Sequence, residues 1–277
     1  MVRKTLTLAL ASALLAGCGA AAASTLTANP APTAKPAVTL TVFAAASLAD
    51  AFTQLGQRFE ALNPGVHVAF NFAGSQQLAA QINQGAPADV FASANLAQMK
   101  LVADGGRASE ATVFALNQLV LVFPKDNPGQ ITALPDLGRP GLRIMLAAQA
   151  VPVGQYALDF LDKASQDPAF GPAFKDAVLR NVVSYEDNAK QVFAKVALGE
   201  VDAGIVYATD ALGASAEAVS TLAIPEAFNT IARYPIAALN DSAHRDWARS
   251  FVSFVLAPDG QRLLGQFGFM AAAAEQQ

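Results

Sequence analysis

The feature that most constrains this fold is a junction in which a short apolar strand meets a helix through a turn of small residues. Val38 to Phe43 is apolar and β-branched like a buried strand, and Ala44 to Ser47 is small. Apolar residues then recur every three or four positions up to Leu62, as in an amphipathic helix. Ser47 and Asp50 approximate a capping box. Such a junction leaves backbone N–H groups at the positive end of a helix dipole, where an anion can bind.

The same junction recurs along the chain. Strands are predicted at Val66 to Phe72, Arg143 to Ala147 and Val182 to Tyr185, and helices begin near Ser75, Val153 and Ala189. Because strands alternate with helices throughout, we expect an α/β protein with mostly parallel sheets, whose ligands bind at the carboxyl ends of the strands. The helix starts at Ser47, Ser75, Val153 and Ala189 are therefore predicted to meet, together with Tyr207, which ends a strand that begins at Ala203.

The first 37 residues are predicted to lie outside the fold. Arg3 and Lys4 precede a hydrophobic run, so residues 1–17 are typical of an export signal peptide. Leu-Ala-Gly-Cys, ending at Cys18, resembles the lipobox of bacterial lipoproteins, which implies lipidation of Cys18 and an exported, membrane-anchored protein. The alternative is an incidental cysteine in a signal peptide that is cut elsewhere. Residues 18–37, rich in Ala, Thr and Pro, then form an extended tether.

Size and charge limit what the remaining residues, 38–277, can do. They reach the length at which one hydrophobic core tends to give way to two, so two lobes are expected. The net charge is −4 and no basic stripe is present, which argues against a nucleic-acid partner. Cys18 is the only cysteine, so the chain is predicted to have no intramolecular disulfide.

The predicted site offers hydrogen-bond donors and no acceptor. Its donors are the hydroxyls of Ser47, Ser75 and Tyr207 and the backbone N–H groups at helix starts. An oxyanion that keeps a proton, such as phosphate near neutral pH, would leave that proton unpaired at a cost of about 1 to 3 kcal/mol. The pattern therefore favours fully deprotonated tetrahedral oxyanions.

Five motifs occur along the chain in an order that one known family shares. They are Phe-Ala-Ala-Ala-Ser-Leu at 43–48, Gly-Ala-Pro-Ala-Asp-Val-Phe-Ala-Ser-Ala at 85–94, Pro-Lys-Asp-Asn-Pro at 124–128, Val-Pro-Val-Gly-Gln-Tyr-Ala at 151–157 and Gly-Ile-Val-Tyr at 204–207. In these motifs the chain resembles the periplasmic molybdate-binding proteins of ABC transporters. The resemblance implies a two-lobed type II periplasmic-binding-protein fold, molybdate and usually tungstate as ligands, and a membrane permease as partner. It implies no enzymatic activity and no cofactor, and we expect a monomer.

The resemblance also assigns the site. It implies that the oxyanion is held by the hydroxyls of Ser47, Ser75 and Tyr207. Backbone amides of Ser47, Ser75, Val153 and Ala189 complete the site, with Asn188 as the alternative to Ala189. No free metal cation is implied, because the ligand is the oxyanion itself.

The resemblance further predicts how the lobes are divided. We expect the chain to cross between lobes near Asn117 to Phe123, within one long apolar strand from Phe114, and to return near Ala232 to Ala238. Pro235 suits an edge or a crossing strand. Lobe I then comprises residues 38–119 plus 232–277, and lobe II residues 120–231. An anion bridging Ser47 and Ser75 on one lobe to Val153, Ala189 and Tyr207 on the other would favour closure.

Other functions remain as alternatives. A hydrolase with Ser75 as nucleophile lacks the Gly-x-Ser-x-Gly elbow, and neither His67 nor His244 has an evident partner. A metal-ion binder of the same fold should carry carboxylates or imidazoles where this chain has Ser, Val, Ala and Tyr. A sulfate binder differs only in cavity size, and a structural lipoprotein would bind no oxyanion.

Overall fold

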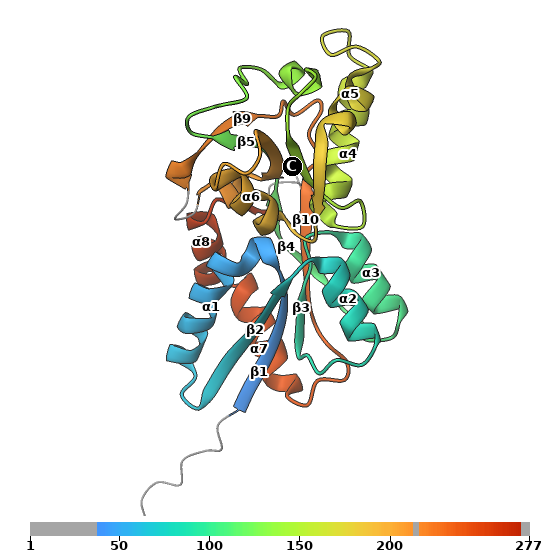
Figure 1. Ribbon diagram of the computed structural model, residues 1–277. Coiled ribbons are helices and arrows are strands. Elements are labelled where there is room, and N and C mark those ends of the chain that lie inside the picture. The colour runs from blue at the N-terminus through green and yellow to red at the C-terminus, as the bar shows by residue number, and fades with distance from the viewer. Residues whose placement is uncertain (1–37, 213–215, 273–277) are drawn as a thin grey trace, which may run out of the picture. The chain divides into compact units, whose positions relative to one another are not determined.

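The computed structural model describes residues 38–212 and 216–272. In this part of the chain, strands and helices are organised around two β-sheets, and we call the portions built on them lobe I and lobe II (Figure 1). The predicted signal peptide at 1–17, Cys18 and the tether up to residue 37 lie outside the described residues. Within the described ranges, no helix combines the length and apolarity that a membrane span needs.

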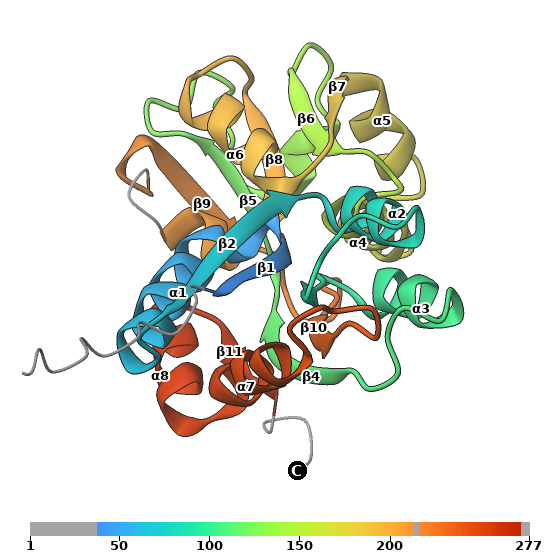
Figure 2. The same cartoon turned by 90° about the horizontal axis from the view of Figure 1, so that it is seen from below.

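Lobe I is built on a sheet with the strand order β11-β4-β10-β3-β1-β2. Its strands are β1 (Val38–Ala45), β2 (Val66–Ala73), β3 (Val90–Ala92), β4 (Thr112–Asn117), β10 (Ala232–Ala238) and β11 (Met270–Ala271). Its helices are α1 (Ala49–Leu62), α2 (Ser75–Asn83), α3 (Leu96–Asp104), α7 (Arg245–Leu256) and α8 (Pro258–Gln266). Helices α1, α7 and α8 cover one face of the sheet, and α2 and α3 cover the other (Figure 2).

Lobe II is built on a sheet with the strand order β7-β6-β8-β5-β9. Its strands are β5 (Leu119–Pro124), β6 (Ile144–Ala147), β7 (Val182–Glu186), β8 (Ala203–Tyr207) and β9 (Val219–Ala223). Its α-helices within the described residues are α4 (Pro152–Ser165), α5 (Phe174–Asn181) and α6 (Ala189–Ala197). Helices α4 and α6 both pack on the strands, and α5 packs on α4.

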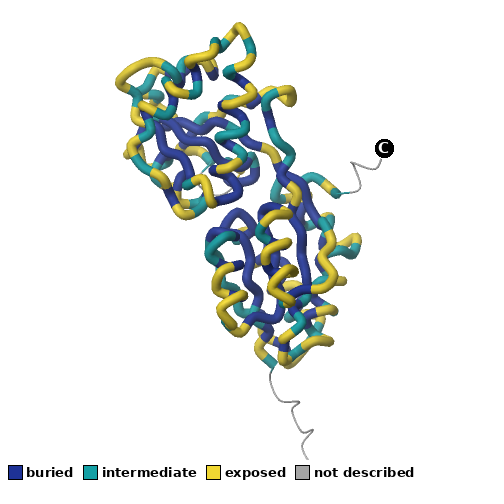
Figure 3. Tube along the Cα trace, turned by 90° about the vertical axis from the view of Figure 1, so that its right-hand side faces the viewer, coloured by how far each residue is buried: buried dark blue, intermediate teal, exposed yellow. Residues whose placement is uncertain are grey.

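Helices on both faces explain why the second half of β1, from Val42 to Ala45, is apolar at every position. Leu40 and Val42 are fully buried in the large hydrophobic core with Phe52 of α1, whereas Phe43 belongs to a second cluster with Leu78 of α2. Successive side chains of a strand point to opposite faces, so a strand covered on both sides needs an apolar residue at nearly every position. Figure 3 shows the result, with buried strands inside each lobe and the exposed surface on the outer helices and loops.

The α/β class and the two-lobed fold are confirmed, but the sheets are mixed rather than mostly parallel. In lobe I, β1 pairs in parallel with β2 and β3, and β10 pairs antiparallel with β3 and β4. In lobe II, β6 pairs in parallel with β7 and β8, and β5 pairs antiparallel with β8 and β9. Alternation of strands and helices predicts parallel pairing only for strands that a helix connects. The chain enters β5 and β10 directly from the other lobe, so the pattern does not predict their direction.

The expectation of one long strand was wrong, and of the two positions that suited Pro235, an edge or a crossing strand, the structure shows the crossing strand. The apolar run from Phe114 to Phe123 is divided at Gln118 between β4 of lobe I and β5 of lobe II. Strand β10 lies between β4 and β3, not at an edge, and its register with β4 shifts between Tyr234 and Pro235. A proline has no N–H to give to the ladder, and this irregularity accommodates it inside the sheet.

The two chain crossings between the lobes are tied together by one side chain. Asn229, in the segment between β9 and β10, donates from Nδ2 to the carbonyl oxygen of Leu119 at 2.9 Å. Its Oδ1 accepts from the backbone N–H of the same residue at 3.0 Å. The outgoing and returning segments are therefore held side by side at the start of β5.

Candidate functional site

The residues predicted to bind the ligand lie together around one small cavity between the lobes. Ser47 and Ser75 come from lobe I, whereas Val153, Ala189 and Tyr207 come from lobe II. The remaining lining residues are Ala45, Ala46, Ala73, Gly74, Ala94, Val151, Pro152 and the alternative donor Asn188. The space inside is about 10 Å³, near the minimum that holds one water-sized group, so the site suits one small ion rather than an organic solute.

Ser47 is held by a side chain from a distant strand and not by its own helix. It lies in the 3₁₀ turn Ala46–Leu48 that joins β1 to α1, and it is buried. Its Oγ lies 2.9 Å from the Tyr234 hydroxyl on β10. The predicted capping box was wrong, because no side chain caps this turn or α1, and Asp50 pairs instead with Lys190 of α6.

Ser75 occupies the first position of α2, directly after Gly74. It is 1% exposed, and its Oγ accepts a hydrogen bond from the backbone N–H of Ala94 at 3.0 Å. A serine hydroxyl that accepts in this way keeps its own proton free to donate into the cavity. Gly74 is required by space, because a Cβ there would lie 2.3 Å from the carbonyl oxygen of Asp187 in lobe II.

Lobe II supplies the starts of two helices. Helix α4 begins with Pro152, which suits a first position because proline has no N–H, and Val153 is the buried second residue. Helix α6 begins with Ala189 after Asn188, whose Oδ1 caps the helix by accepting from the N–H of Gln191 at 3.0 Å. The first N–H groups of a helix have no partner within it, so those of Val153 and Ala189 are available to a ligand.

The hydroxyl of Tyr207 is the strongest indication that the cavity binds a ligand. It ends β8, it is 1% exposed, and its hydroxyl has no hydrogen-bond partner among the described residues. Burial raises the pKa of Tyr207 well above its usual value, as do the neighbouring Tyr234, Tyr156 and Asp210. The phenol therefore stays protonated and donates. A buried hydroxyl without a partner costs about 1 to 3 kcal/mol, which an acceptor in the cavity would relieve.

The described lining residues are all electrically neutral, so the attraction for an anion comes from dipoles. Two serine hydroxyls, one phenol and backbone N–H groups converge, and the helix starts add partial positive charge. Lys190 of α6 directly follows the lining residue Ala189 and carries a charge. Lys190 Nζ lies 2.6 Å from Asp50 Oδ2 on lobe I and 3.8 Å from Asp210 Oδ1, whose pKa burial raises to about 6.

Further contacts join the lobes beside the cavity. Gln76 of lobe I donates from Nε2 to the carbonyl oxygen of Asp187 in lobe II at 3.0 Å. The pair between Lys190 and Asp50 is a second contact of this kind between the lobes. Sequence reasoning missed these contacts, because none of the residues involved is unusual for an exposed helix or loop.

A buried polar network behind Ser47 was also missed. The Tyr234 hydroxyl forms a hydrogen bond with Ser47 Oγ. It also accepts a hydrogen bond from Asn117 Nδ2 at 3.5 Å. Asn117 Nδ2 also donates to Thr209 Oγ1 of lobe II at 2.8 Å. One signal was available in the sequence, since Tyr234 stands in a mostly apolar strand and a buried tyrosine hydroxyl usually needs a partner.

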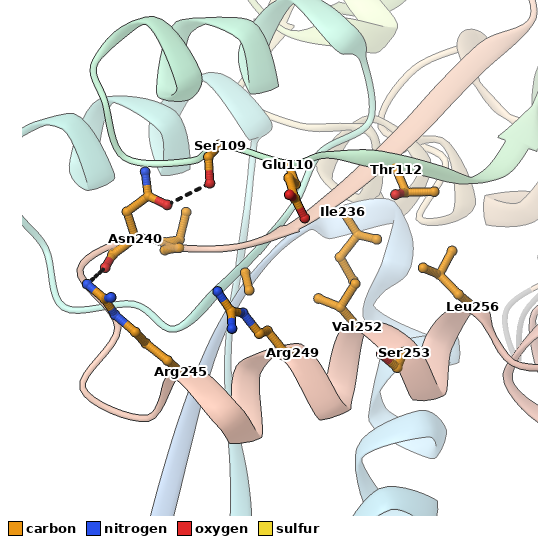
Figure 4. A pocket seen from close by; sticks show the side chains of 12 residues that line it. Ser109, Glu110, Thr112, Ile236, Asn240, Arg245, Arg249, Val252, Ser253 and Leu256 are labelled. Atoms are coloured by element: carbon orange, nitrogen blue, oxygen red, sulfur yellow. Dashed lines mark hydrogen bonds between the residues drawn. The ribbon is translucent and has the colours of Figure 1, made fainter.

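A larger cavity of about 390 Å³ lies elsewhere on lobe I and contains none of the predicted residues. Figure 4 shows Arg245 and Arg249 of α7 beside it, with Glu110 and Asn240 opposite. These four side chains are exposed or partly exposed, and Arg245 donates to the carbonyl oxygen of Asn240. We call this the outer groove.

The described residues offer little to the hydrolase and metal-ion alternatives. Among residues 38–212 and 216–272, no group of three His, Cys, Asp or Glu side chains could hold a metal ion. His67 pairs on the surface with Glu60, its Nδ1 2.9 Å from Oε1. Neither His67 nor His244 lines the cavity beside Ser75.

Comparison with known proteins adds to this geometry. Residues 40–270 match the family model described as bacterial extracellular solute-binding protein. Over 257 residues the chain is 41% identical to the molybdate-binding protein ModA of Mycobacterium tuberculosis, covering 92% of this chain and 94% of that relative.

Solved structures give the same fold. The substrate binding domain of a putative molybdenum ABC transporter from Clostridium difficile is 27% identical, with a TM-score of 0.62, covering 85% of this chain and 99% of that one. The sulfate-binding protein SubI of Mycobacterium tuberculosis is 19% identical, with a TM-score of 0.75, covering 85% and 87%. The second likeness concerns the fold alone.

Proposed function

This chain belongs to the family of bacterial extracellular solute-binding proteins, and on that premise we propose that it captures molybdate, and tungstate with it, between its two lobes. The family consists of extracytoplasmic transport proteins and is not a class of enzymes. The observation that carries the proposal is the buried hydroxyl of Tyr207, which has no hydrogen-bond partner within residues 38–212 and 216–272 and can donate to an anion in a cavity lined by neutral residues.

The donor set matches a dianion without a proton. Ser47, Ser75 and Tyr207 supply hydroxyls, and Val153 and Ala189 supply N–H groups, with Asn188 as the alternative to Ala189. Hydrogen bonds to a charged group contribute about 1.5 kcal/mol or more each, so five of them give roughly 7 kcal/mol. Such a gain corresponds to affinity near the micromolar range before ordering costs.

Sulfate is the second candidate, because it too is a tetrahedral dianion without a proton. The likeness to SubI supports it only through the fold, whereas the 41% identical relative is a molybdate-binding protein. On the ground of that relative, we expect the site to prefer molybdate and tungstate to sulfate.

We propose that binding closes the two lobes. Residues 38–119 plus 232–277 would move as one body and residues 120–231 as the other, bending where β4 continues into β5 and where the chain returns to β10. An anion that contacts Ser47 and Ser75 on one side and Tyr207 on the other favours the closed form in proportion to those contacts.

The closed form would then dock, as a monomer, on the membrane permease of an ABC transporter. Lipidation of Cys18 would keep the protein at the membrane, with residues 18–37 as the tether. The anchor, the monomeric state and the docking face belong to the proposal.

Calorimetric and thermal-shift titrations of residues 19–277 with molybdate, tungstate, sulfate and phosphate at fixed ionic strength test this function. We expect saturable one-to-one binding of molybdate and tungstate, a weaker response to sulfate and almost none to phosphate. A preference for sulfate would keep the fold and overturn the ligand. No response to any of the four anions would overturn the function.

A further inference from the structure

A directed chain of hydrogen bonds leads from the crossing between the lobes to the cavity. It runs from Asn117, at the end of β4, through Tyr234 on β10 to Ser47. All three residues are buried, and Tyr234 is fully inaccessible to solvent. The Tyr234 hydroxyl therefore acts inside the protein, where water cannot replace it.

The far end of this chain has a defined direction, which leaves the Tyr234 proton available to Ser47. Asn117 Oδ1 accepts from the backbone N–H of Gln118 at 2.9 Å, which leaves the amide nitrogen of Asn117 to face Tyr234 and Thr209. The amide nitrogen can only donate, so the oxygen of Tyr234 accepts and its proton is free to point at Ser47. Burial raises the pKa of Tyr234 well above its usual value, so this proton is retained.

The ring of Tyr234 is locked independently of its hydroxyl. It makes edge-on contacts with Phe114, Tyr207 and Phe269, at centroid distances of 6.3, 5.7 and 5.5 Å. Substitution by phenylalanine would therefore keep the ring in place and remove only the hydrogen bond to Ser47.

The hydrogen bonds of Ser75 indicate what the Tyr234 hydroxyl can do for Ser47. Ser75 Oγ already accepts from the N–H of Ala94, so its proton can go only to the ligand. Ser47 Oγ has no such backbone donor among the described residues and lies instead 2.9 Å from the Tyr234 hydroxyl, 187 residues away in sequence, which can donate to it. A backbone N–H can thus fill the acceptor position of Ser75, and a side-chain hydroxyl can fill that of Ser47.

We propose that Tyr234 is a positioning residue that makes Ser47 a donor only, so that the site discriminates against oxyanions that still carry a proton. This inference rests on the proposed function. Without the phenol, the Ser47 hydroxyl can rotate and accept a proton from the ligand, and hydrogen phosphate gains a partner that it lacks in the wild-type site.

The test measures the affinities of Tyr234→Phe for molybdate and for inorganic phosphate by calorimetry. We expect molybdate affinity to fall up to about tenfold, because the Ser47 hydroxyl is no longer held in its donating orientation, while phosphate affinity stays or rises. The ratio of molybdate affinity to phosphate affinity therefore falls. A general loss of packing would weaken the binding of both anions and leave this ratio unchanged. Tyr185→Phe on β7, at a tyrosine that is 52% exposed, is the matched control and should bind both anions as the wild type does.

A double-mutant cycle with Ser47→Ala separates positioning from structure. If Tyr234 acts through Ser47, Tyr234→Phe changes nothing further in the Ser47→Ala background. Additive losses, or an unchanged molybdate-to-phosphate ratio in Tyr234→Phe, would overturn the inference while wild-type molybdate binding left the proposed function intact. A wild-type protein that binds no molybdate would overturn both. Melting temperatures of all variants verify that each is folded.

Discussion

The interlobe cavity and the outer groove would attract an anion in different ways, the cavity through neutral hydrogen-bond donors and the groove through charged side chains. The cavity is small and lined by neutral residues, among them the buried Ser47, Ser75 and Tyr207 and the starts of two helices. The outer groove is much larger and carries the guanidinium groups of Arg245 and Arg249, with the carboxylate of Glu110 opposite. In water a charge is screened and its side chain is mobile, whereas fixed dipoles in a dry cavity keep most of their strength.

This difference shows why a protein with a net charge of −4 can still be built to hold a dianion. Oriented hydrogen-bond donors take the place of charged side chains, and they also select between anions. A guanidinium attracts any anion nearby, but a set of fixed donors without an acceptor favours those that have lost every proton. The comparison predicts large effects for small changes in the cavity and small effects for large changes in the groove.

The largest effect is expected for Tyr207→Phe, which removes one oxygen atom from the cavity. Its hydroxyl has no partner among the described residues, so the variant loses a ligand contact and breaks no internal hydrogen bond. We expect the dissociation constant for molybdate to rise about 10- to 100-fold, as for a hydrogen bond to a charged group. Calorimetry checks this, and unchanged affinity would remove Tyr207 from the site.

Asp210 tests the effect of burial on a charge beside the cavity. Its pKa is about 6 in the folded protein because of burial, against an ordinary value of 3.8. The folded state thus holds a proton that the unfolded state has lost, so this contribution to stability is present below the ordinary pKa and disappears as pH rises through about 6.

Asp210→Asn should therefore gain melting temperature relative to the wild type, by several degrees, as pH is raised from about 4 to about 8. Asparagine keeps an oxygen that can accept from the N–H of Tyr207, as Asp210 Oδ2 does at 3.3 Å. Parallel pH profiles for the two proteins would contradict the prediction.

A smaller effect is expected for Lys190→Met, which breaks the ion pair with Asp50 across the lobes. The two side chains are 29% and 52% exposed, so solvent screens the pair and its contribution should be about 1 kcal/mol or less. We expect molybdate to dissociate a few-fold faster in stopped-flow measurements, and the difference from wild type should shrink at high salt. Asp50→Asn is the matching variant, and a difference independent of salt would rule out an electrostatic latch.

The smallest effect is expected in the outer groove. Arg249→Ala deletes a full positive charge, yet we expect molybdate affinity to stay within about twofold, because an exposed charge outside the cavity is screened. Calorimetry beside Tyr207→Phe gives the direct comparison. A loss as large as that of Tyr207→Phe would show that long-range charge dominates, and would break the contrast between the two cavities.

Local patterns account for what the sequence could predict. Each helix start near the cavity follows a strand and a few small residues, and these local signals identified Ser47, Ser75, Val153, Ala189 and Tyr207, which the structure brings together. The α/β class follows from the same alternation. That these residues bind the ligand stays a prediction for the variants above.

Contacts between distant segments account for what was missed. Ser47 bonds Tyr234 instead of capping its own helix, and Asp50 bonds Lys190, 140 residues away. Antiparallel pairing by β5 and β10 depends on where the chain crosses between lobes, which no local period encodes. A residue can satisfy the pattern for a cap while its partner lies in another part of the fold.

The close approach at Gly74 would make the proposed closed form easy to obstruct. The space between this residue and the carbonyl oxygen of Asp187 is smaller than a methyl group requires, so one added carbon there would act as a wedge between the lobes. A wedged protein would keep every donor in the cavity and yet be unable to bring the two sets together. Paired with the unmodified chain and fluorescent labels on opposite lobes, it would supply the permanently open reference that an optical sensor for the ligand needs.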